Sequence, residues 1–284
     1  MKAEPHLTLS LDLAALRQRL HTQFVGRPFH YYPSLPSTMD TAQEGARAGA
    51  PEGAAYFAEE QTAGRGRLGR RWVTPPGSSL ALSVLLRPPL ERLPRLTVVG
   101  ALAVATAIEQ ATALRPAIKW PNDVRLGGRK VAGILVDSSF QAGGGQGPST
   151  PLRTGPAGGS GQAPGYAIVG IGVNVNFDPD AEPDIAAVAT SLAKELGRPL
   201  AREEALAALL EQLERWYLAP KDEALAAWRQ RLETLGQRVV VQWRDVWEEG
   251  LAEATDDDGR LILRRDDGST VALAVGEVSL RSAT

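Results

Sequence analysis

The sequence predicts an α+β protein in two parts, a domain of strands and helices over residues 1–235 and a small β-barrel over residues 236–284. In the first part, segments that alternate apolar and polar residues, as strands do, are interspersed with segments of helical period. From residue 237 onward the pattern changes to five short strand-like runs, with acidic turns at residues 256–259 (DDDG) and 266–268 (DDG). Short strands joined by such turns are typical of a small barrel.

Five helices are expected in the first part. Residues 10–23 repeat leucine on one face and have Ser10 in the position of a helix cap. A second helix opens within PSLPSTMD and runs to about residue 48. The remaining three are expected at residues 94–114, 202–217 and 222–235, the last ended by Gly236.

Strands are expected between these helices along the sequence. Gly127 and Gly128 lie between VRL and KVAGILVD and predict a two-residue hairpin turn. Residues 141–165 hold nine glycines and four prolines in 25 positions, so we expect a disordered loop that lengthens a hairpin connection. The expected strands cover residues 29–32, 56–60, 80–86, 117–120 and 166–176.

The composition excludes several kinds of protein. Hydrophobic residues make up 43% of the 284 residues and the formal net charge is -2, so the chain lacks the positive charge typical of nonspecific nucleic-acid binding. No apolar run reaches the roughly 18 residues that span a bilayer, and the N-terminus lacks the pattern of a signal peptide. There is no cysteine, and the three histidines have no metal-ligand spacing. We expect a cytoplasmic protein that binds neither membrane nor DNA.

A basic loop is the first candidate for a binding site. Residues 64–72 (GRGRLGRRW) contain four arginines and no acidic side chain on a backbone made pliable by glycine. Such loops are more often solvated turns, and GRGRLG is not the phosphate loop of nucleoside triphosphatases. The pattern indicates a small, strongly anionic ligand only if other segments contribute to the same site.

A second segment, KWPNDVRLGGRK (residues 119–130), supplies such groups. The expected hairpin returns Lys130 toward Asp123, which lies where an extended Trp-Pro must turn. A carboxylate beside a lysine and arginines suits a magnesium-triphosphate site, since the carboxylate helps to hold the metal and the cations meet phosphate oxygens. The alternative is that Asp123 is a turn residue that bonds its own backbone.

Two further segments add polar groups. On a strand over residues 170–176, one face carries Gly170, Gly172, Asn174 and Asn176. This face is a floor on which a planar heterocycle can lie while Asn174 bonds its edge. The alternative is a strand narrowed for close packing. Ser37 and Asp40 have capping-box spacing, which leaves Thr38 free for a ligand, and Gln61 precedes the arginine loop.

Five motifs in order resemble those of the bacterial biotin protein ligases, the biotin–[acetyl-CoA-carboxylase] ligases. The likeness runs from about residue 25 to the C-terminal EVSLR. It implies a mixed β-sheet flanked by helices, the class II synthetase-like fold of biotin and lipoate ligases, with an SH3-like C-terminal barrel. The motifs are STMD (37–40), EEQTAGRGRLGRRW (59–72), KWPNDV (119–124), KVAGILVD (130–137) and GIGVNVN (170–176).

The resemblance implies an activity and a role for each candidate residue. Such ligases use ATP and Mg²⁺ to convert biotin to biotinyl-5'-AMP and pyrophosphate, then transfer biotin to a lysine of a biotin carboxyl carrier protein. Arg67, Lys130 and Asp123 are implied as catalytic, with Asp123 near the metal. Biotin is expected to contact Ser37, Thr38, Gln61, Arg65, Gly66, Arg67 and Lys130. ATP or the adenylate is expected to contact Arg67, Arg70, Trp72, Trp120, Asn122, Lys130 and Asn174, with adenine on Asn174.

Other functions remain as alternatives at this point. Only 36 residues precede Ser37, so we expect the monofunctional type without an N-terminal DNA-binding domain. A lipoate ligase shares the fold and the adenylation chemistry, and a nucleic-acid-binding regulator is an alternative of another class, with Trp72 stacking on bases. The resemblance also implies a possible homodimer.

Overall fold

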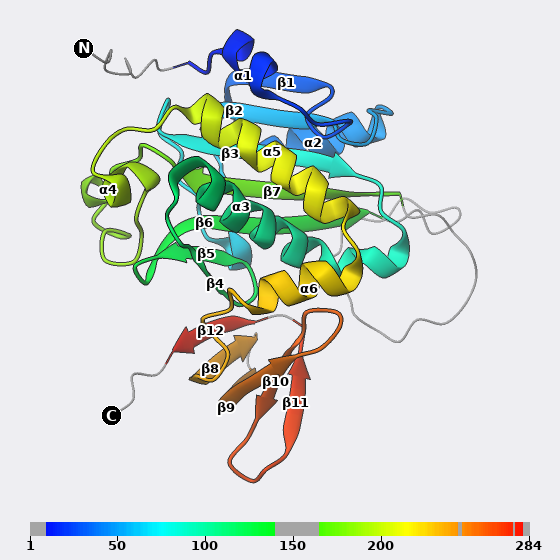
Figure 1. Cartoon of the computed structure of the whole chain (residues 1–284), viewed down its shortest axis with the longest axis vertical. Coiled ribbons are helices and arrows are strands. Elements are labelled where there is room, and N and C mark those ends of the chain that lie inside the picture. The colour runs from blue at the N-terminus through cyan, green and yellow to red at the C-terminus, as the bar shows by residue number, and fades with distance from the viewer. Residues whose placement is uncertain (1–9, 140–164, 244–245, 275, 281–284) are drawn as a thin grey trace.

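Two β-sheets organise the chain in the computed structural model, which describes residues 10–139, 165–243, 246–274 and 276–280. The larger sheet has seven strands in the order β1-β2-β3-β7-β6-β5-β4 (Figure 1). The smaller sheet has five strands in the order β11-β10-β9-β8-β12. The α+β fold class expected from the sequence is confirmed. The predicted loop at 141–165 lies outside the described residues, except for its last position.

The larger sheet is mixed, because β1 (Phe29–Leu35) and β2 (Ala55–Gln61) pair in parallel whereas every other neighbouring pair is antiparallel. The predicted hairpin between β5 and β6 is confirmed, since Gly127 and Gly128 have φ angles of 53° and 78°, the left-handed values of a type I′ turn. The remaining strands are β3 (Ser79–Leu86), β4 (Ala117–Lys119), β5 (Asp123–Leu126), β6 (Arg129–Ser139) and β7 (Tyr166–Asn174).

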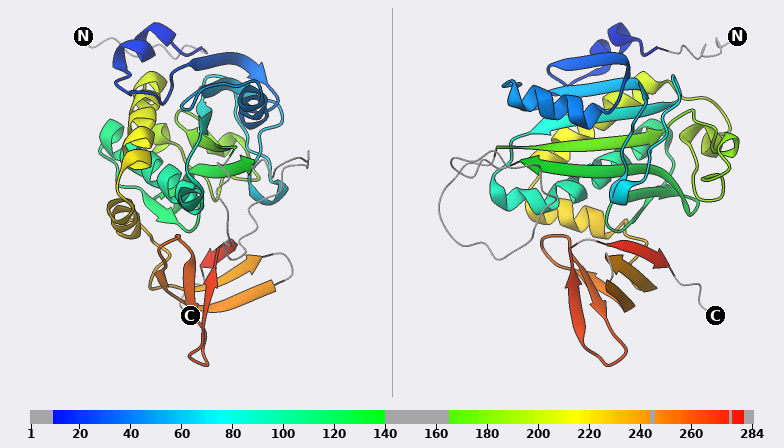
Figure 2. Two further views of the ribbon diagram at one scale, coloured as in Figure 1. Left: turned by 90° about the vertical axis from the view of Figure 1, so that its right-hand side faces the viewer. Right: turned by 180° about the vertical axis from the view of Figure 1, so that it is seen from behind.

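Helices cover both faces of this sheet. Figure 1 shows α3 (Leu96–Thr112) and α5 (Arg202–Leu218) side by side over one face, and Figure 2 shows α2 (Thr38–Arg47) on the opposite face. The side chains of Leu102, Val169 and Leu206, from α3, β7 and α5, have no exposed surface. The continuous apolar pattern of residues 96–108 is therefore explained by burial between α5 and the sheet. Single 3₁₀ segments occur at Leu90–Arg95 and Pro179–Ala181.

The structure corrects the predicted cap of the first helix. Helix α1 (Leu13–Arg19) is capped by Asp12, whose carboxylate accepts hydrogen bonds from the N–H groups of Ala14 and Ala15 at 2.9 and 3.0 Å. Ser10 lies outside the helix, because the cap must directly precede the first helical residue. The prediction of Ser10 as the cap is wrong.

The helix predicted at residues 222–235 is shorter than expected. Helix α6 (Lys221–Arg229) ends before Gly236, because the following residues pair with the edge of the larger sheet. Ile118 of β4 donates to the carbonyl of Arg231 at 2.7 Å and accepts from the N–H of Glu233 at 3.0 Å. A further helix, α4 (Leu192–Leu196), was not predicted, although Ser191 caps it and it is followed by a glycine.

The smaller sheet matches the five strand-like runs at the C-terminal end of the sequence. Its neighbouring strands are all antiparallel, and the last strand, β12, returns to pair with the first, β8. The predicted boundary at residue 235 stays a prediction. The strands are β8 (Arg238–Trp243), β9 (Val246–Thr255), β10 (Leu261–Arg264), β11 (Thr270–Leu273) and β12 (Glu277–Leu280).

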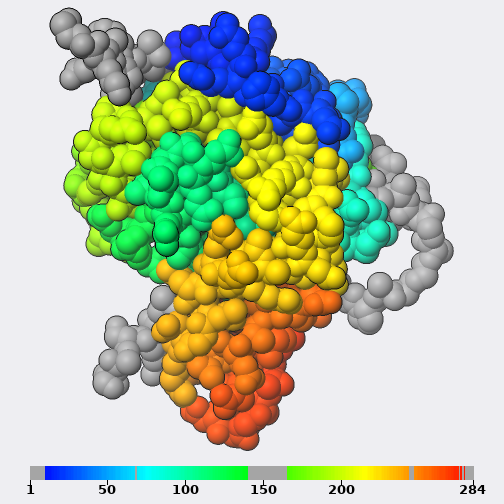
Figure 3. Space-filling model, viewed as in Figure 1, coloured from blue at the N-terminus to red at the C-terminus, as the bar shows by residue number. Residues whose placement is uncertain are grey.

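The smaller sheet forms a lobe that meets the larger body beside α6, as Figure 3 shows. Lys221 of α6 contacts Asp257 at 2.9 Å, and this hydrogen bond lowers the pKa of the Asp257 carboxyl. Gly259 approaches α3 so closely that a Cβ atom there would lie 2.8 Å from Cγ2 of Val98. Its φ of 81° also favours glycine, so this turn fits its neighbour only without a side chain.

Candidate active site

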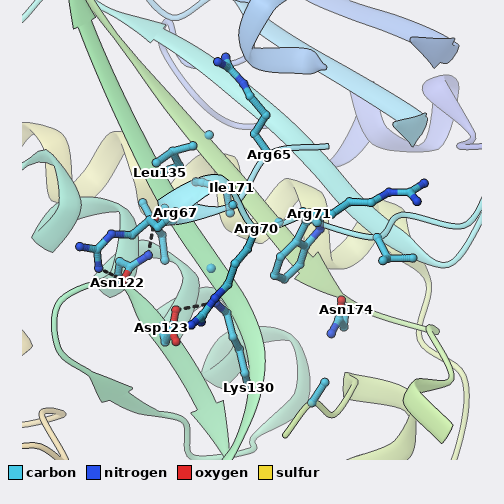
Figure 4. Close-up of a pocket in the computed structure, with 18 of the residues that line it drawn as sticks. Arg65, Arg67, Arg70, Arg71, Asn122, Asp123, Lys130, Leu135, Ile171 and Asn174 are labelled. Carbon is cyan, nitrogen blue, oxygen red and sulfur yellow. Dashed lines mark hydrogen bonds and ion pairs between the residues drawn. The ribbon is translucent and has the colours of Figure 1, made fainter. Parts of the chain in front are cut away.

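One cavity of about 430 Å³ brings the predicted site residues together. It lies against β6 and β7, and the arginine loop covers it (Figure 4). The volume falls in the roughly 300–1,000 Å³ range of small-molecule sites. Its lining includes Ser37, Thr38, Gln61, Arg65, Gly66, Arg67, Arg70, Trp72, Trp120, Asn122, Asp123, Lys130 and Asn174.

The neutral half of the cavity consists of Ser37, Thr38 and Gln61, all at most 8% exposed. The Gln61 side-chain oxygen accepts hydrogen bonds from the N–H of Thr38 at 2.8 Å and from its hydroxyl at 3.1 Å. The Thr38 hydroxyl also lies 2.8 Å from the Ser83 hydroxyl of β3. Gln61 is therefore fixed in orientation by the start of α2.

Ser37 does not cap α2 as its spacing predicted. Its side chain makes no capping hydrogen bond, and its buried hydroxyl has no partner among the described residues. Asp40 instead forms an ion pair with Arg65 at 2.7 Å, which removes the acidic member of the predicted capping box. Because buried hydroxyls are normally hydrogen-bonded, Ser37 is a candidate donor or acceptor for a ligand.

The floor of the cavity is the glycine face of β7, and Trp72 lies on it. A Cβ atom at Gly172 would lie 2.3 Å from Cε2 of the Trp72 indole, and one at Gly133 of β6 would lie 3.5 Å from its Cζ3. The glycines do admit a flat ring, but in this structure the ring belongs to the protein. The indole N–H of Trp72 is buried and has no partner among the described residues.

Asn174 and Asn176, predicted on the same strand face, have different partners. The Asn174 amide donates to the carbonyl of Thr190 at 3.0 Å while the residue lines the cavity. Asn176 lies beyond the end of β7 and exchanges two hydrogen bonds with the backbone of Leu200, at 2.9 and 3.0 Å. Asn176 therefore fixes a neighbouring segment.

The arginine loop folds back on itself. Its ends are joined by the hydrogen bond from the Trp72 N–H to the Gly64 carbonyl at 2.9 Å, and inside it a single 3₁₀ turn spans Arg67–Gly69. A Cβ atom at Gly64 would lie 2.4 Å from the Trp72 carbonyl oxygen, so this closure requires glycine. The loop is thus a compact turn closed by its own backbone.

Four arginines leave this turn in different directions. Figure 4 shows Arg67 directed toward Asn122 and Arg70 toward Asp123, whereas Arg65 and Arg71 point away from them. Arg67 donates to the side-chain oxygen of Asn122 at 2.8 Å. The Arg65 guanidinium is held by Asp40, so the side chain of this predicted biotin contact ties the loop to α2.

The cationic half of the cavity consists of Arg67, Arg70 and Lys130. The Lys130 ammonium forms an ion pair with Asp123 at 2.6 Å and lies 5.6 Å from the centre of the Trp72 ring. Both partners of the ion pair are partly exposed, with side-chain exposures of 34% and 26%. The contact therefore lies where a charged ligand group can replace either partner.

Trp120 faces the smaller lobe. It is 1% exposed, its indole N–H donates to the Gly259 carbonyl at 2.9 Å, and its backbone N–H donates to the Thr234 hydroxyl at 2.9 Å. Gly276, which directly precedes β12, and Val278 of β12 also line the cavity. The smaller lobe thus contributes to the wall and holds the turn that carries Asn122 and Asp123.

Sequence reasoning missed one wall of the cavity. Residues of the segment between β7 and α4 line it, and they come from a stretch without strand or helix periodicity. No local signal distinguishes them from a surface loop. They are Phe177, Ile185, Val188 and Ala189.

The described residues offer no ready-made metal centre. Among them, no group of three or more histidine, aspartate or glutamate side chains could hold a metal ion. Asp123 brings a single carboxylate into the cavity. Mg²⁺ is commonly bound through one or two carboxylates with phosphate oxygens from the substrate, so Asp123 fits an ion that arrives with a triphosphate.

None of the helices in the described part of the chain combines the length and the apolar character that a membrane span requires.

The fold and this cavity define the class of protein. Residues 31–147 match the biotin/lipoate A/B protein ligase family, and residues 234–281 match the biotin protein ligase C-terminal domain. The first match is shared by biotin and lipoate ligases. The second is named for the biotin enzymes alone, and the lipoate alternative is not favoured.

Individual relatives narrow the class further. The chain is 32% identical over 265 residues to the bifunctional ligase/repressor of Bacillus subtilis, covering 91% of this chain and 76% of that protein. It is 38% identical over 226 residues to the biotin–[acetyl-CoA-carboxylase] ligase of Paracoccus denitrificans, covering 76% and 85%. The chain belongs to the biotin protein ligase family and is a biotin ligase.

Solved structures agree with this assignment. The biotin protein ligase of Aquifex aeolicus, in complex with biotin and ATP, has a TM-score of 0.70 and 27% identity, covering 89% of this chain and 98% of that one. The Leishmania major enzyme in complex with biotinyl-5-AMP has a TM-score of 0.55 and 25% identity, covering 86% and 97%. The alternative function, a nucleic-acid-binding regulator, is not favoured by these comparisons.

Proposed function

We propose that the cavity binds biotin with its ring in the neutral half and its carboxylate at the cationic half, and joins it there to ATP. The observation that carries the proposal is the change of polarity within one cavity. Buried neutral groups lie at one end of the cavity, the apolar side chains of Met39 and Leu135 line its middle, and cations lie at the other end. Biotin has the same sequence of a polar ring, an apolar chain and a carboxylate.

The cations serve the first chemical step. The biotin carboxylate attacks the α-phosphate of ATP, which brings two negative groups together and expels pyrophosphate. Positive groups fixed near the reacting atoms reduce this repulsion and stabilise the charge that moves onto the leaving group. The contacts of Arg67 with Asn122 and of Lys130 with Asp123, which direct both cations to the cavity, support this role.

Asp123 is the residue that would help to hold Mg²⁺. The ion, when bound with ATP, would neutralise part of the triphosphate charge. The ion pair with Lys130 keeps the carboxylate directed into the cavity at 2.6 Å from the ammonium. If phosphate replaces Asp123 at Lys130, the carboxylate becomes available as a ligand to the metal.

The arginine loop protects the product of this step. A mixed anhydride of biotin and AMP reacts with water or stray amines unless it is enclosed, and lids commonly supply such enclosure. The loop ends at Trp72, whose indole lies on the glycine floor, so the loop can cover an adenylate lying there. Trp72 would then move from the floor or stack against the ligand.

The acceptor and the location complete the proposal. Biotin is transferred to a lysine of the biotin carboxyl carrier protein of acetyl-CoA carboxylase, in the cytoplasm where ATP is available. The name of the Paracoccus relative supports this acceptor. A homodimer and the absence of DNA binding stay predictions from the sequence.

One experiment tests the proposal. Pyrophosphate release is measured with ATP and either biotin or lipoate, with and without Mg²⁺, and labelling of a carrier domain is followed in parallel. We expect release with biotin and Mg²⁺ and carrier labelling only thereafter. Equal rates with lipoate, or release without biotin, would contradict the proposed ligand.

A further inference from the structure

A short segment takes the place of β7 beside Lys130. Strand β7 pairs with β6 as far as Ala132 and Val173, and Lys130 lies beyond this pair. Here the Lys130 N–H donates to the Val188 carbonyl at 2.8 Å, and the Lys130 carbonyl accepts from the Thr190 N–H at 2.8 Å. The backbone of Lys130 is therefore held by residues 188–190 and not by the strand that supports the rest of β6.

Thr190 joins this segment to three other elements. It is 0% exposed, and its hydroxyl donates to the Glu195 carboxylate of α4 at 2.5 Å. The same carboxylate oxygen accepts from Arg129, the residue before Lys130, at 2.7 Å. The Thr190 carbonyl accepts from Asn174 at the end of β7. Thr190 is thus a buried residue that is hydrogen-bonded to β6, β7 and α4 at once.

On its other side, toward β5, Lys130 lies at an irregularity in the strand pairing. The hydrogen bonds to residues 188–190 are therefore more important for holding it. The pairing of β5 and β6 shifts register between Val124 and Arg125, so that Val131 is an extra residue in β6. A bulge of this kind re-aims the neighbouring side chains and interrupts the ladder. Lys130 therefore has a disturbed ladder on one side and the 188–190 segment on the other.

We propose that Thr190 is a positioning residue for Lys130, acting through Glu195 and Arg129. The inference rests on the proposed function, because it takes Lys130 as the cation that meets the reacting groups. Val188 and Ala189 of the same segment line the cavity, so Thr190 also fixes the wall next to Lys130. A displacement of about 1 Å at a reacting group is enough to lower a rate by up to about a hundredfold.

The test compares Thr190→Val with Thr190→Ser. Valine keeps the shape and both backbone hydrogen bonds but cannot donate to Glu195. We expect about a tenfold lower kcat for pyrophosphate release, with the KM values for biotin and ATP little changed. Serine restores the donor and is expected to restore the rate. Glu195→Gln, which removes the charge that Arg129 meets, is a second variant that lowers kcat in the same way.

A double-mutant cycle separates positioning from general damage. In a Lys130→Ala background, Thr190→Val is expected to cause no further loss of kcat, because the group that it positions is absent. Thr106→Val is the matched control. It removes another buried threonine hydroxyl, which lies in α3 and accepts from Trp216 of α5 at 2.9 Å. Its effect is expected to be the same in both backgrounds.

Two results overturn the inference in distinguishable ways. If Thr190→Val lowers kcat by the same factor with and without Lys130, Thr190 does not act through Lys130, and the proposed function is unaffected. If Lys130→Ala alone leaves pyrophosphate release unchanged, the role of Lys130 in the proposed function is wrong, and the inference falls with it.

Discussion

The neutral and cationic halves of the cavity differ in where their side chains find partners. In the neutral half, Thr38 donates two hydrogen bonds to Gln61, and its hydroxyl also bonds to that of Ser83, all within the buried part of the sheet. In the cationic half, Lys130 and Arg67 bond to Asp123 and Asn122, which themselves line the cavity. The neutral half is fixed by the fold, whereas contacts of the cationic half can be exchanged for those of a ligand. We therefore expect substitutions in the neutral half to change the affinity for biotin. Substitutions in the cationic half are expected to change the rate of adenylation and the retention of the adenylate.

The largest effect is expected from Lys130→Ala. Removing one preorganised charge from a site of this type lowers kcat by roughly 100-fold to 1,000-fold. Rapid-quench measurement of adenylate formation checks this, with Lys130→Arg as the variant that keeps the charge. An unchanged adenylation rate with weaker biotin binding would place Lys130 with the neutral half and break the comparison.

Arg67→Gly is expected to loosen the adenylate once it has formed. A hydrogen bond to a charged group contributes roughly 1.5–3 kcal/mol, so release should be roughly 10-fold to 100-fold faster. Dissociation of preformed adenylate is measured directly, and biotin on lysines of an added bystander protein reports its escape. Retention equal to that of the unmodified chain would show that Arg67 does not hold the intermediate.

Thr38→Val tests the neutral half. It removes the hydroxyl bonded to Gln61 and Ser83 but keeps the backbone N–H that orients Gln61. The KM for biotin is expected to rise about tenfold with kcat little changed, the loss of roughly one buried hydrogen bond. Steady-state kinetics and calorimetric binding of biotin check this. A fall in kcat at constant KM would contradict the division between the halves.

The smallest effect is expected from Arg71→Gln. Arg71 belongs to the same loop as Arg67 but its side chain points away from the cationic half in Figure 4. Both kcat and adenylate retention should change less than about twofold, as for an exposed charge with weak interactions. The same assays as for Arg67→Gly provide a matched comparison within one loop. A loss as large as that of Arg67→Gly would mean that the loop acts through its total charge.

Continuous motifs explain which parts of the site could be predicted from the sequence. The arginine loop, the turn with Asp123 and the glycine face of β7 are each contained in one short segment, so residue type and spacing indicate them. Val188, Gly276 and Val278 lack such a signal, because folding alone brings them to the cavity. Trp72 on the glycine floor is a tertiary contact of the same kind.

As with the site, the parts of the fold that depend on local sequence can be predicted, and those that depend on tertiary contacts cannot. Strands and hairpin turns followed local periodicity and glycine placement. The end of α6 could not be predicted, since pairing of Arg231 and Glu233 with Ile118 replaces the helix there. The capping-box spacing of Ser37 is the same whether its side chain turns back to the helix or toward a cavity, so spacing alone cannot predict that its buried hydroxyl caps nothing.

The register of β6 and β7 has a practical consequence for handling this enzyme. Their pairing runs to Ser139 and Tyr166, about 30 Å along the strand from Lys130 at 3.3 Å per residue. Chain added between these two residues leaves the sheet at the end remote from the chemistry. A fluorescent protein or an affinity tag inserted at this junction would therefore lie within the chain and away from Lys130.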